Sequence, residues 1–178
     1  PKEAGKPFHW QSRESLLLMN NLLLTAACAM VMLGTLYPLL AEALDMGKIS
    51  VGPPYFGKLF LILMAPLILL IPFGPLSRWQ QEQLGTVARW LTPWLMLALV
   101  VALIAYFRAP QHPLKTAMAY FSGLWIFLGT LHFIWRRFKH GNGRFTPEMS
   151  GMVLAHLGVA VFCFGALMTE GLSIEKDV

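Results

Sequence analysis

The sequence predicts an all-α fold, a polytopic transmembrane helix bundle with about five membrane spans that forms a fragment of a larger protein. Hydrophobic residues make up 56% of the 178 residues and charged residues only 13%, whereas soluble domains contain about 45–50% apolar and about 25% charged residues. The apolar residues are gathered into five long runs, and about 20 such residues can cross the roughly 30 Å hydrocarbon core of a bilayer. Together these observations disfavour a water-soluble fold.

The five runs are expected to form a single transmembrane domain fragment over residues 1–178. We place its spans, in chain order, at about 18–40, 57–75, 87–107, 116–135 and 150–169. The chain begins without a methionine and ends directly after the last run, as expected of a fragment.

The first span carries polar residues near both of its ends. Asn20 and Asn21 lie near its start, where we expect them to cap or cross-link helices. Glu42 lies near its end, where the carboxylate could relay protons, hold a ligand or only reach the membrane interface. Cys28 and Cys163 lie inside apolar runs and are expected to behave as small hydrophobes. No disulfide or metal site follows from them.

Prolines shape the second span, about 57–75. Pro53 and Pro54 are expected to lie in an external loop before this span, because paired prolines cannot continue a helix. Pro72 and Pro75 predict kinked or broken backbone in its last turns, unless neighbouring helices satisfy the freed carbonyl groups.

The third span begins with two tryptophans, and the fifth contains regularly spaced glycines. The third begins with Trp90 and Trp94, which predict an aromatic belt at the membrane interface. The fifth contains Gly151, Gly158 and Gly165 at seven-residue intervals, a stripe that allows the backbone of another helix to approach closely.

The basic residues predict how the chain crosses the membrane. If the spans alternate in direction, nine of the 14 Lys and Arg residues lie on one side, including four between the fourth and fifth spans. The positive-inside rule then puts the N-terminus in the cytoplasm and the C-terminus outside. We therefore interpret the net charge of +5 as a topology signal, and expect the lipid bilayer as a partner and no nucleic acid.

Two histidines lie inside apolar spans, where ionisable groups are rare and mark functional sites. His156 has Met152 and Ala160 one turn away, and these apolar, partly small neighbours would let a flat macrocycle reach the imidazole. An axial ligand of haem and a histidine hydrogen-bonded across a helix interface both remain open. His132 lies at a comparable depth, so a bis-histidine pair is geometrically possible, although an interfacial histidine that snorkels towards the basic loop is the simpler interpretation.

Arg136 and Arg137 end the fourth span. Their guanidinium groups could bind haem propionates, because guanidinium binds carboxylate in a bidentate manner, although topology alone also explains them. The residues do not identify a catalytic group, and the chain contains no C-x-x-C-H motif for its own covalent haem.

Several segments in one order resemble the CcmF family over essentially the whole chain. They are SRESLLLMNNLLL (12–24), LGTLYPL (33–39), ISVGPPYF (49–56), MVLAHLGVAV (152–161) and SIEKDV (173–178). The resemblance implies the C-terminal half of the transmembrane bundle of a System I cytochrome c haem lyase in the bacterial cytoplasmic (inner) membrane, with the fragment's C-terminus periplasmic. Such a protein receives haem from the haem chaperone CcmE and attaches it to the CxxCH cysteines of apocytochrome c, together with CcmH or CcmI-type partners.

The resemblance also implies a cofactor and a site. In that family one transmembrane histidine from this half and one from the earlier half hold an auxiliary haem b, and the A-H-L-G context matches that histidine at His156. His156 is therefore the expected axial ligand of the haem iron. The family's tryptophan-rich motif is absent from the sequence, so we expect the fragment alone to be inactive. A solute transporter fragment and a haem b subunit for electron transfer or structure, without ligase activity, are the alternatives.

Overall fold

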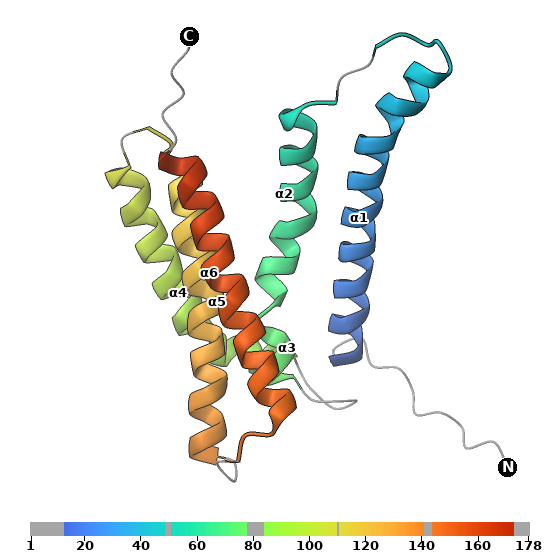
Figure 1. Ribbon diagram of the computed structural model, residues 1–178. Coiled ribbons are helices and arrows are strands. Elements are labelled where there is room, and N and C mark those ends of the chain that lie inside the picture. The colour runs from blue at the N-terminus through green and yellow to red at the C-terminus, as the bar shows by residue number, and fades with distance from the viewer. Residues whose placement is uncertain (1–12, 49–50, 78–83, 110, 141–143, 173–178) are drawn as a thin grey trace, which may run out of the picture.

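The computed structural model (Figure 1) is built from helices joined by short connections. It describes residues 13–48, 51–77, 84–109, 111–140 and 144–172, and the statements below concern these residues. The helices are α1 (Arg13–Ala43), α2 (Pro53–Leu70), α3 (Phe73–Leu76), α4 (Leu84–Arg108), α5 (Pro113–His140) and α6 (Pro147–Leu172).

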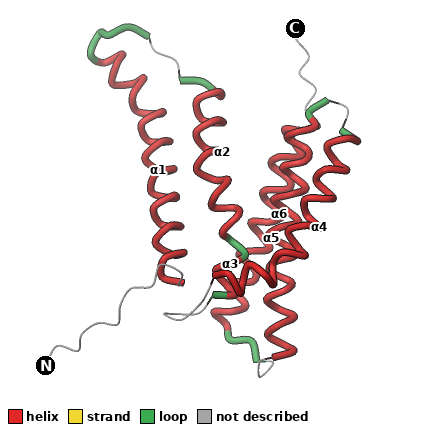
Figure 2. Tube along the Cα trace, turned by 180° about the vertical axis from the view of Figure 1, so that it is seen from behind, coloured by secondary structure: helices red, strands yellow, loops and turns green. Residues whose placement is uncertain are grey.

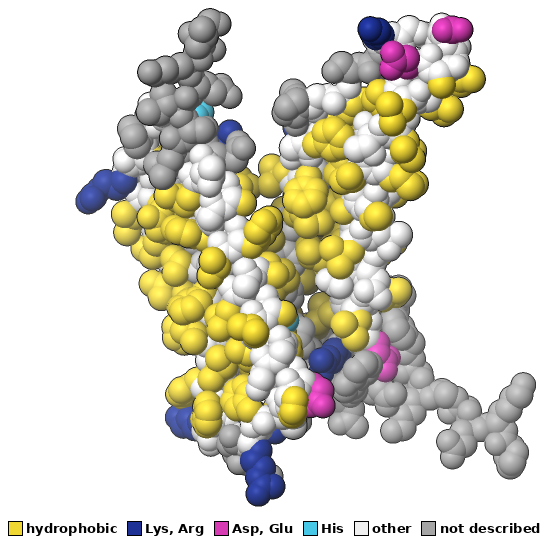
Figure 3. All heavy atoms as spheres, viewed as in Figure 1, with side chains coloured by type: hydrophobic (Ala, Val, Ile, Leu, Met, Phe, Trp, Pro, Cys, Tyr) yellow, Lys and Arg dark blue, Asp and Glu magenta, His cyan; other side chains and the backbone are white. Residues whose placement is uncertain are grey.

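Five segments are long and apolar enough to cross a membrane, with α2 and α3 counted as one segment. The expected all-α bundle of about five spans is therefore confirmed. The helices extend beyond the spans placed from hydropathy, since α1 alone has 31 residues. Figure 3 shows hydrophobic side chains over the middle of the molecule and charged side chains gathered near its two ends, the distribution expected across a bilayer.

The start of α2 differs from the expectation. Pro53 and Pro54 do not lie in a loop before the helix but occupy its first two positions, after Gly52 as N-cap. The first helical amide groups have no partner within the helix, so a proline costs no hydrogen bond there, and its fixed φ suits the helix. The helix therefore begins four residues before the expected span start near 57.

The expected irregular backbone is confirmed between α2 and α3. The helix stops at Leu70, and Ile71 and Pro72 form a turn before α3 begins. The carbonyl of Leu69 is freed from helical pairing and accepts a hydrogen bond from the indole Nε1–H of Trp125 on α5, at 3.2 Å. A neighbouring helix thus satisfies backbone that would be costly to leave unpaired in lipid.

Gly129 of α5 makes room for this turn. A Cβ atom at Gly129 would lie 2.5 Å from the Cβ of Pro72 and 3.0 Å from its Cγ. Real Cβ atoms do not approach this closely, so the absence of a side chain at Gly129 is what lets the turn seat against α5. Glycine here serves packing between helices.

The helices fall into two groups that meet at this turn. In Figures 1 and 2, α4, α5 and α6 lie side by side, α1 lies along α2, and α3 lies between the groups. The buried core belongs mainly to the first group and centres on α4 and α5. Its members are Val87, Leu91, Ala98, Trp125, Ile126 and Ala160.

Candidate functional site

His156 lies ten residues into α6 and is half-buried. Its Nδ1 is 2.8 Å from the carbonyl oxygen of Met152, one turn earlier. A carbonyl can only accept, so in the neutral imidazole the hydrogen is on Nδ1 and the lone pair is on Nε2. This is the arrangement that metal-binding histidines use, with one ring nitrogen donating to an acceptor and the other free to bind the metal.

The surroundings of His156 fit a flat macrocycle on one side. Ala160, one turn further on, is buried, and this part of α6 packs closely on Gly123 of α5. Val159, which lies three residues after His156 on the same side of the helix, is in contrast 38% exposed. The imidazole therefore lies between a packed face and an open apolar face, and the residues present suit one axial ligand of a haem.

His132 forms a hydrogen bond with a residue of α4. The expectation that its side chain snorkels towards the basic loop is therefore wrong. The ring is half-buried, and the Nε1–H of Trp94 donates to its Nδ1 at 3.0 Å. Because indole can only donate, the Nδ1 lone pair is occupied and the hydrogen of a neutral His132 is on Nε2. That Nε2 is buried and has no hydrogen-bond partner among the described residues. In this arrangement His132 offers no free lone pair to a metal.

Trp90 and Trp94, which the sequence predicts to lie at the membrane interface, are both half-buried in the first half of α4. Both pack against the buried core from its edge, and the guanidinium carbon of Arg136 lies 3.2 Å from the centre of the Trp90 ring. A cation stacked on an indole gains electrostatic energy from the negative ring face. The pair joins α4 to α5 on the same side of α5 as the Trp94–His132 bond.

Arg137 points to the connection that follows α5. Its Nε and one terminal nitrogen donate to the carbonyl oxygen of Arg144, at 3.4 and 3.3 Å. The contacts described above for Arg136 and Arg137 thus join α5 to α4 and to the connection that follows α5.

The remaining sequence-based candidates are separate from one another. Glu42 is exposed in the last turn of α1. Asn20 and Asn21 lie inside α1 and bond to each other at 3.4 Å, so within the described residues they neither cap nor cross-link helices. The two cysteines are free.

The glycine stripe of α6 has no helix against it in the described part of the chain. A Cβ atom at Gly151, Gly158 or Gly165 would meet nothing within 4 Å. The described residues also contain no group of three or more His, Cys, Asp or Glu side chains that could hold a metal ion.

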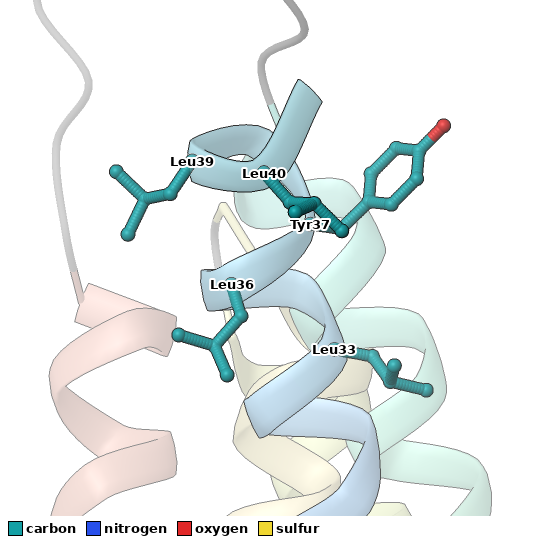
Figure 4. Close-up of a pocket in the computed structure, with 5 residues that line it drawn as sticks. All are labelled: Leu33, Leu36, Tyr37, Leu39 and Leu40. Atoms are coloured by element: carbon teal, nitrogen blue, oxygen red, sulfur yellow. The ribbon is translucent and has the colours of Figure 1, made fainter. Parts of the chain in front are cut away.

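An apolar hollow of about 480 Å³ lies along the C-terminal half of α1 (Figure 4). Its lining residues are Leu33, Leu36, Tyr37, Leu39 and Leu40. All five come from one helix, and Leu36 and Leu39 point away from Tyr37 in the close-up. The hollow lacks the convergent polar groups that are typical of a ligand site.

Comparison with known proteins finds relatives along nearly the whole chain. "Cytochrome c-type biogenesis protein CcmF" of Haemophilus influenzae is 36% identical over 178 residues, which cover 94% of this chain and 27% of that protein. The protein of the same name from Escherichia coli is 39% identical over 94% of this chain and 26% of its own length. "Cytochrome c-type biogenesis protein CycK" of Rhizobium meliloti is 37% identical over 99% of this chain and 28% of its own length.

The chain thus spans about a quarter of the length of these relatives. No family model matches it. No solved structure matches it either.

Proposed function

Because the chain belongs to the CcmF family of cytochrome c-type biogenesis proteins, we propose that it is a membrane segment of a protein that matures cytochrome c, and that its His156 is an axial ligand of haem b. The family relationship supports the general role. The hydrogen bond from His156 to Met152 is the observation that carries the ligand assignment, because it leaves Nε2 as the nitrogen able to bind iron.

The proposed activity of the longer protein is that of a cytochrome c haem lyase. It would take haem from the haem chaperone CcmE and join its vinyl groups to the cysteines of a CxxCH motif in apocytochrome c, with CcmH or CcmI-type partners. The bound haem b would supply a redox-active iron. Within this chain, α6 holds and orients the imidazole, and α5 packs against α6. The thioether chemistry is proposed for residues outside this chain.

The second axial ligand is proposed to come from another part of the longer protein. His132 accepts a hydrogen bond at Nδ1 and carries its hydrogen on Nε2, so the neutral ring has no free lone pair. Cys163 is half-buried within an apolar helix. The open apolar face next to His156 gives a second helix room to approach. Arg136 and Arg137 remain proposed partners of the haem propionates.

The proposed location is the bacterial cytoplasmic membrane. The end of α5 and the connection to α6 carry Arg136, Arg137, Lys139 and Arg144. Lys48 follows α1 and Arg108 ends α4, and these helices end on the opposite side of the molecule (Figure 1). The denser positive charge supports a cytoplasmic start of α1 and a periplasmic end of α6.

The ligand assignment is tested by the visible spectrum of the full-length protein that carries this chain. His156→Gly should remove the low-spin b-type spectrum, and added imidazole should restore it by binding iron in the vacated space. His132→Gln is the matched control and should keep the spectrum, since His132 bonds to Trp94. An unchanged spectrum in His156→Gly would overturn the assignment.

The same preparation separates the alternative functions. Haem transfer from the loaded chaperone to a CxxCH peptide supports the lyase. Bound haem b without such transfer would favour an electron-transfer subunit. A haem-free protein that moves a solute into vesicles would favour a transporter.

A further inference from the structure

The corner between α5 and α6 carries a compact basic and aromatic surface, of which the proposed function involves only Arg137. We call it the α5–α6 corner and define it by Arg137, Phe138, Lys139, Arg144 and Phe145. From its geometry we propose that the α5–α6 corner binds the headgroup of an anionic phospholipid. The proposal needs this end of the helices to lie at a membrane surface, but it does not depend on haem or on the lyase activity.

Two parallel contacts draw the end of α5 and the following connection together. Arg137 donates two hydrogen bonds to the carbonyl of Arg144. The next residue of each segment repeats the pairing, because the rings of Phe138 and Phe145 lie 5.4 Å apart, centre to centre, at 38°. These contacts hold the two segments in register and fix the points from which the charged side chains leave the backbone.

The charges of the α5–α6 corner are concentrated and largely unbalanced. Lys139 and Arg144 are exposed and Arg137 is half-buried, so three cations leave from two segments that touch. The acid described within this part of the chain is Glu148, in the first turn of α6. Like charges held close together repel, and an anion bound between them would relieve that repulsion.

Exposed aromatic residues indicate where the α5–α6 corner lies relative to the bilayer surface. Trp135, one turn before Lys139, is 51% exposed, and Phe138 is 61% exposed. The Nζ of Lys139 lies 4.7 Å from the centre of the Trp135 ring. Exposed tryptophan side chains sit at the headgroup level of a bilayer, so the cations next to Trp135 lie where lipid phosphates lie.

The exposed Phe138 ring favours a lipid over a free anion. A phospholipid offers both a phosphate for the cations and acyl chains for the phenylalanine, whereas inorganic phosphate offers only the first. Basic residues beside an anionic leaflet each contribute about a fivefold gain in binding. Two of them are therefore worth about thirtyfold.

The proposal is tested on the full-length protein in detergent, by titration with phosphatidylglycerol and, separately, with phosphatidylcholine, followed by native mass spectrometry. We expect tighter binding of phosphatidylglycerol. The double variant Lys139→Gln/Arg144→Gln keeps the backbone carbonyl at position 144 and both phenylalanines, and should weaken phosphatidylglycerol binding by about thirtyfold at low salt without changing phosphatidylcholine binding.

Two single variants sharpen the test. Glu148→Gln removes the nearby acid and should strengthen phosphatidylglycerol binding, by up to about fivefold. Arg108→Gln removes an exposed cation that follows the exposed Phe107 at the opposite end of α4, and should change binding by less than about twofold, because that cation stands apart from the α5–α6 corner.

Three results would overturn the proposal. They are equal binding of the two lipids, a double variant that binds phosphatidylglycerol as the unmodified protein does, and full displacement of the lipid by millimolar inorganic phosphate. The last would identify a free anion as the ligand. The haem spectrum of the same samples reports separately on His156, so failure of one proposal leaves the other measurable.

Discussion

The contact between Gly129 and Pro72 makes a sharp prediction about how the two groups of helices are joined. In Gly129→Ala the new methyl group would lie 2.5 Å from the Pro72 Cβ and 3.0 Å from its Cγ. Pro72 is among the most deeply buried side chains and its ring is rigid, so the turn must move away from α5.

The size of the effect follows from three contributions. Overpacking a tight site costs about 1–3 kcal/mol. Movement of the turn also strains the 3.2 Å bond from Trp125 to Leu69, a contribution of about 0.5–1.5 kcal/mol. Alanine recovers about 1 kcal/mol over glycine through its helix propensity. We therefore expect Gly129→Ala to lower the free energy of unfolding by about 1–3 kcal/mol.

The measurement is unfolding of the full-length protein by sodium dodecyl sulfate in mixed micelles, followed by tryptophan fluorescence. Gly57→Ala is the matched control, since a Cβ atom at Gly57 meets nothing within 4 Å, and it should stabilise by at most about 1 kcal/mol. In a double-mutant cycle, Pro72→Gly should cost less in the Gly129→Ala background than in the unmodified protein, because it removes the clashing atoms. Equal effects of Gly129→Ala and Gly57→Ala, with no coupling to Pro72, would refute the reasoning.

Further predictions concern the indole hydrogen bonds. Trp125→Phe keeps an aromatic ring near Phe73 but removes the donor to Leu69, and should lower the unfolding free energy by about 1–3 kcal/mol; no loss would mean that the freed carbonyl finds another donor. Trp94→Phe and His132→Phe should show a coupling of about 1 kcal/mol, because each removes the same hydrogen bond. Strictly additive effects would contradict that bond.

The helices were predictable because hydropathy is a property of consecutive residues. The five runs mark the five segments, and Pro72 and Pro75 correctly predicted the break between α2 and α3. The start of α2 was misplaced because the fixed φ of proline is compatible both with a loop and with the first turn of a helix, and Pro53 and Pro54 lie in the first turn. The local sequence shows that φ is fixed at these prolines, but it does not show whether they precede a helix or begin one.

The contacts of the candidate site were less predictable, because they depend on how one helix slides and rotates against the next. Trp94 and His132 are 38 residues apart, and nothing in either segment specifies the register of α4 against α5. The bond from His156 to Met152 is different, since it joins residues one turn apart on one helix. Met152 was expected beside His156, and regular helix geometry brings its carbonyl to the imidazole.

The break between α2 and α3 also has a consequence for the order in which the protein is made. The Leu69 carbonyl and the Trp125 indole that pairs with it are 56 residues apart. At about 5–20 residues per second, a ribosome needs about 3–11 s to synthesise that interval. During this time the turn at Pro72 lacks the surface of α5 against which it packs, because Gly129 has not been synthesised either. The turn after α2 therefore cannot pack against α5 until the fourth membrane crossing has been synthesised.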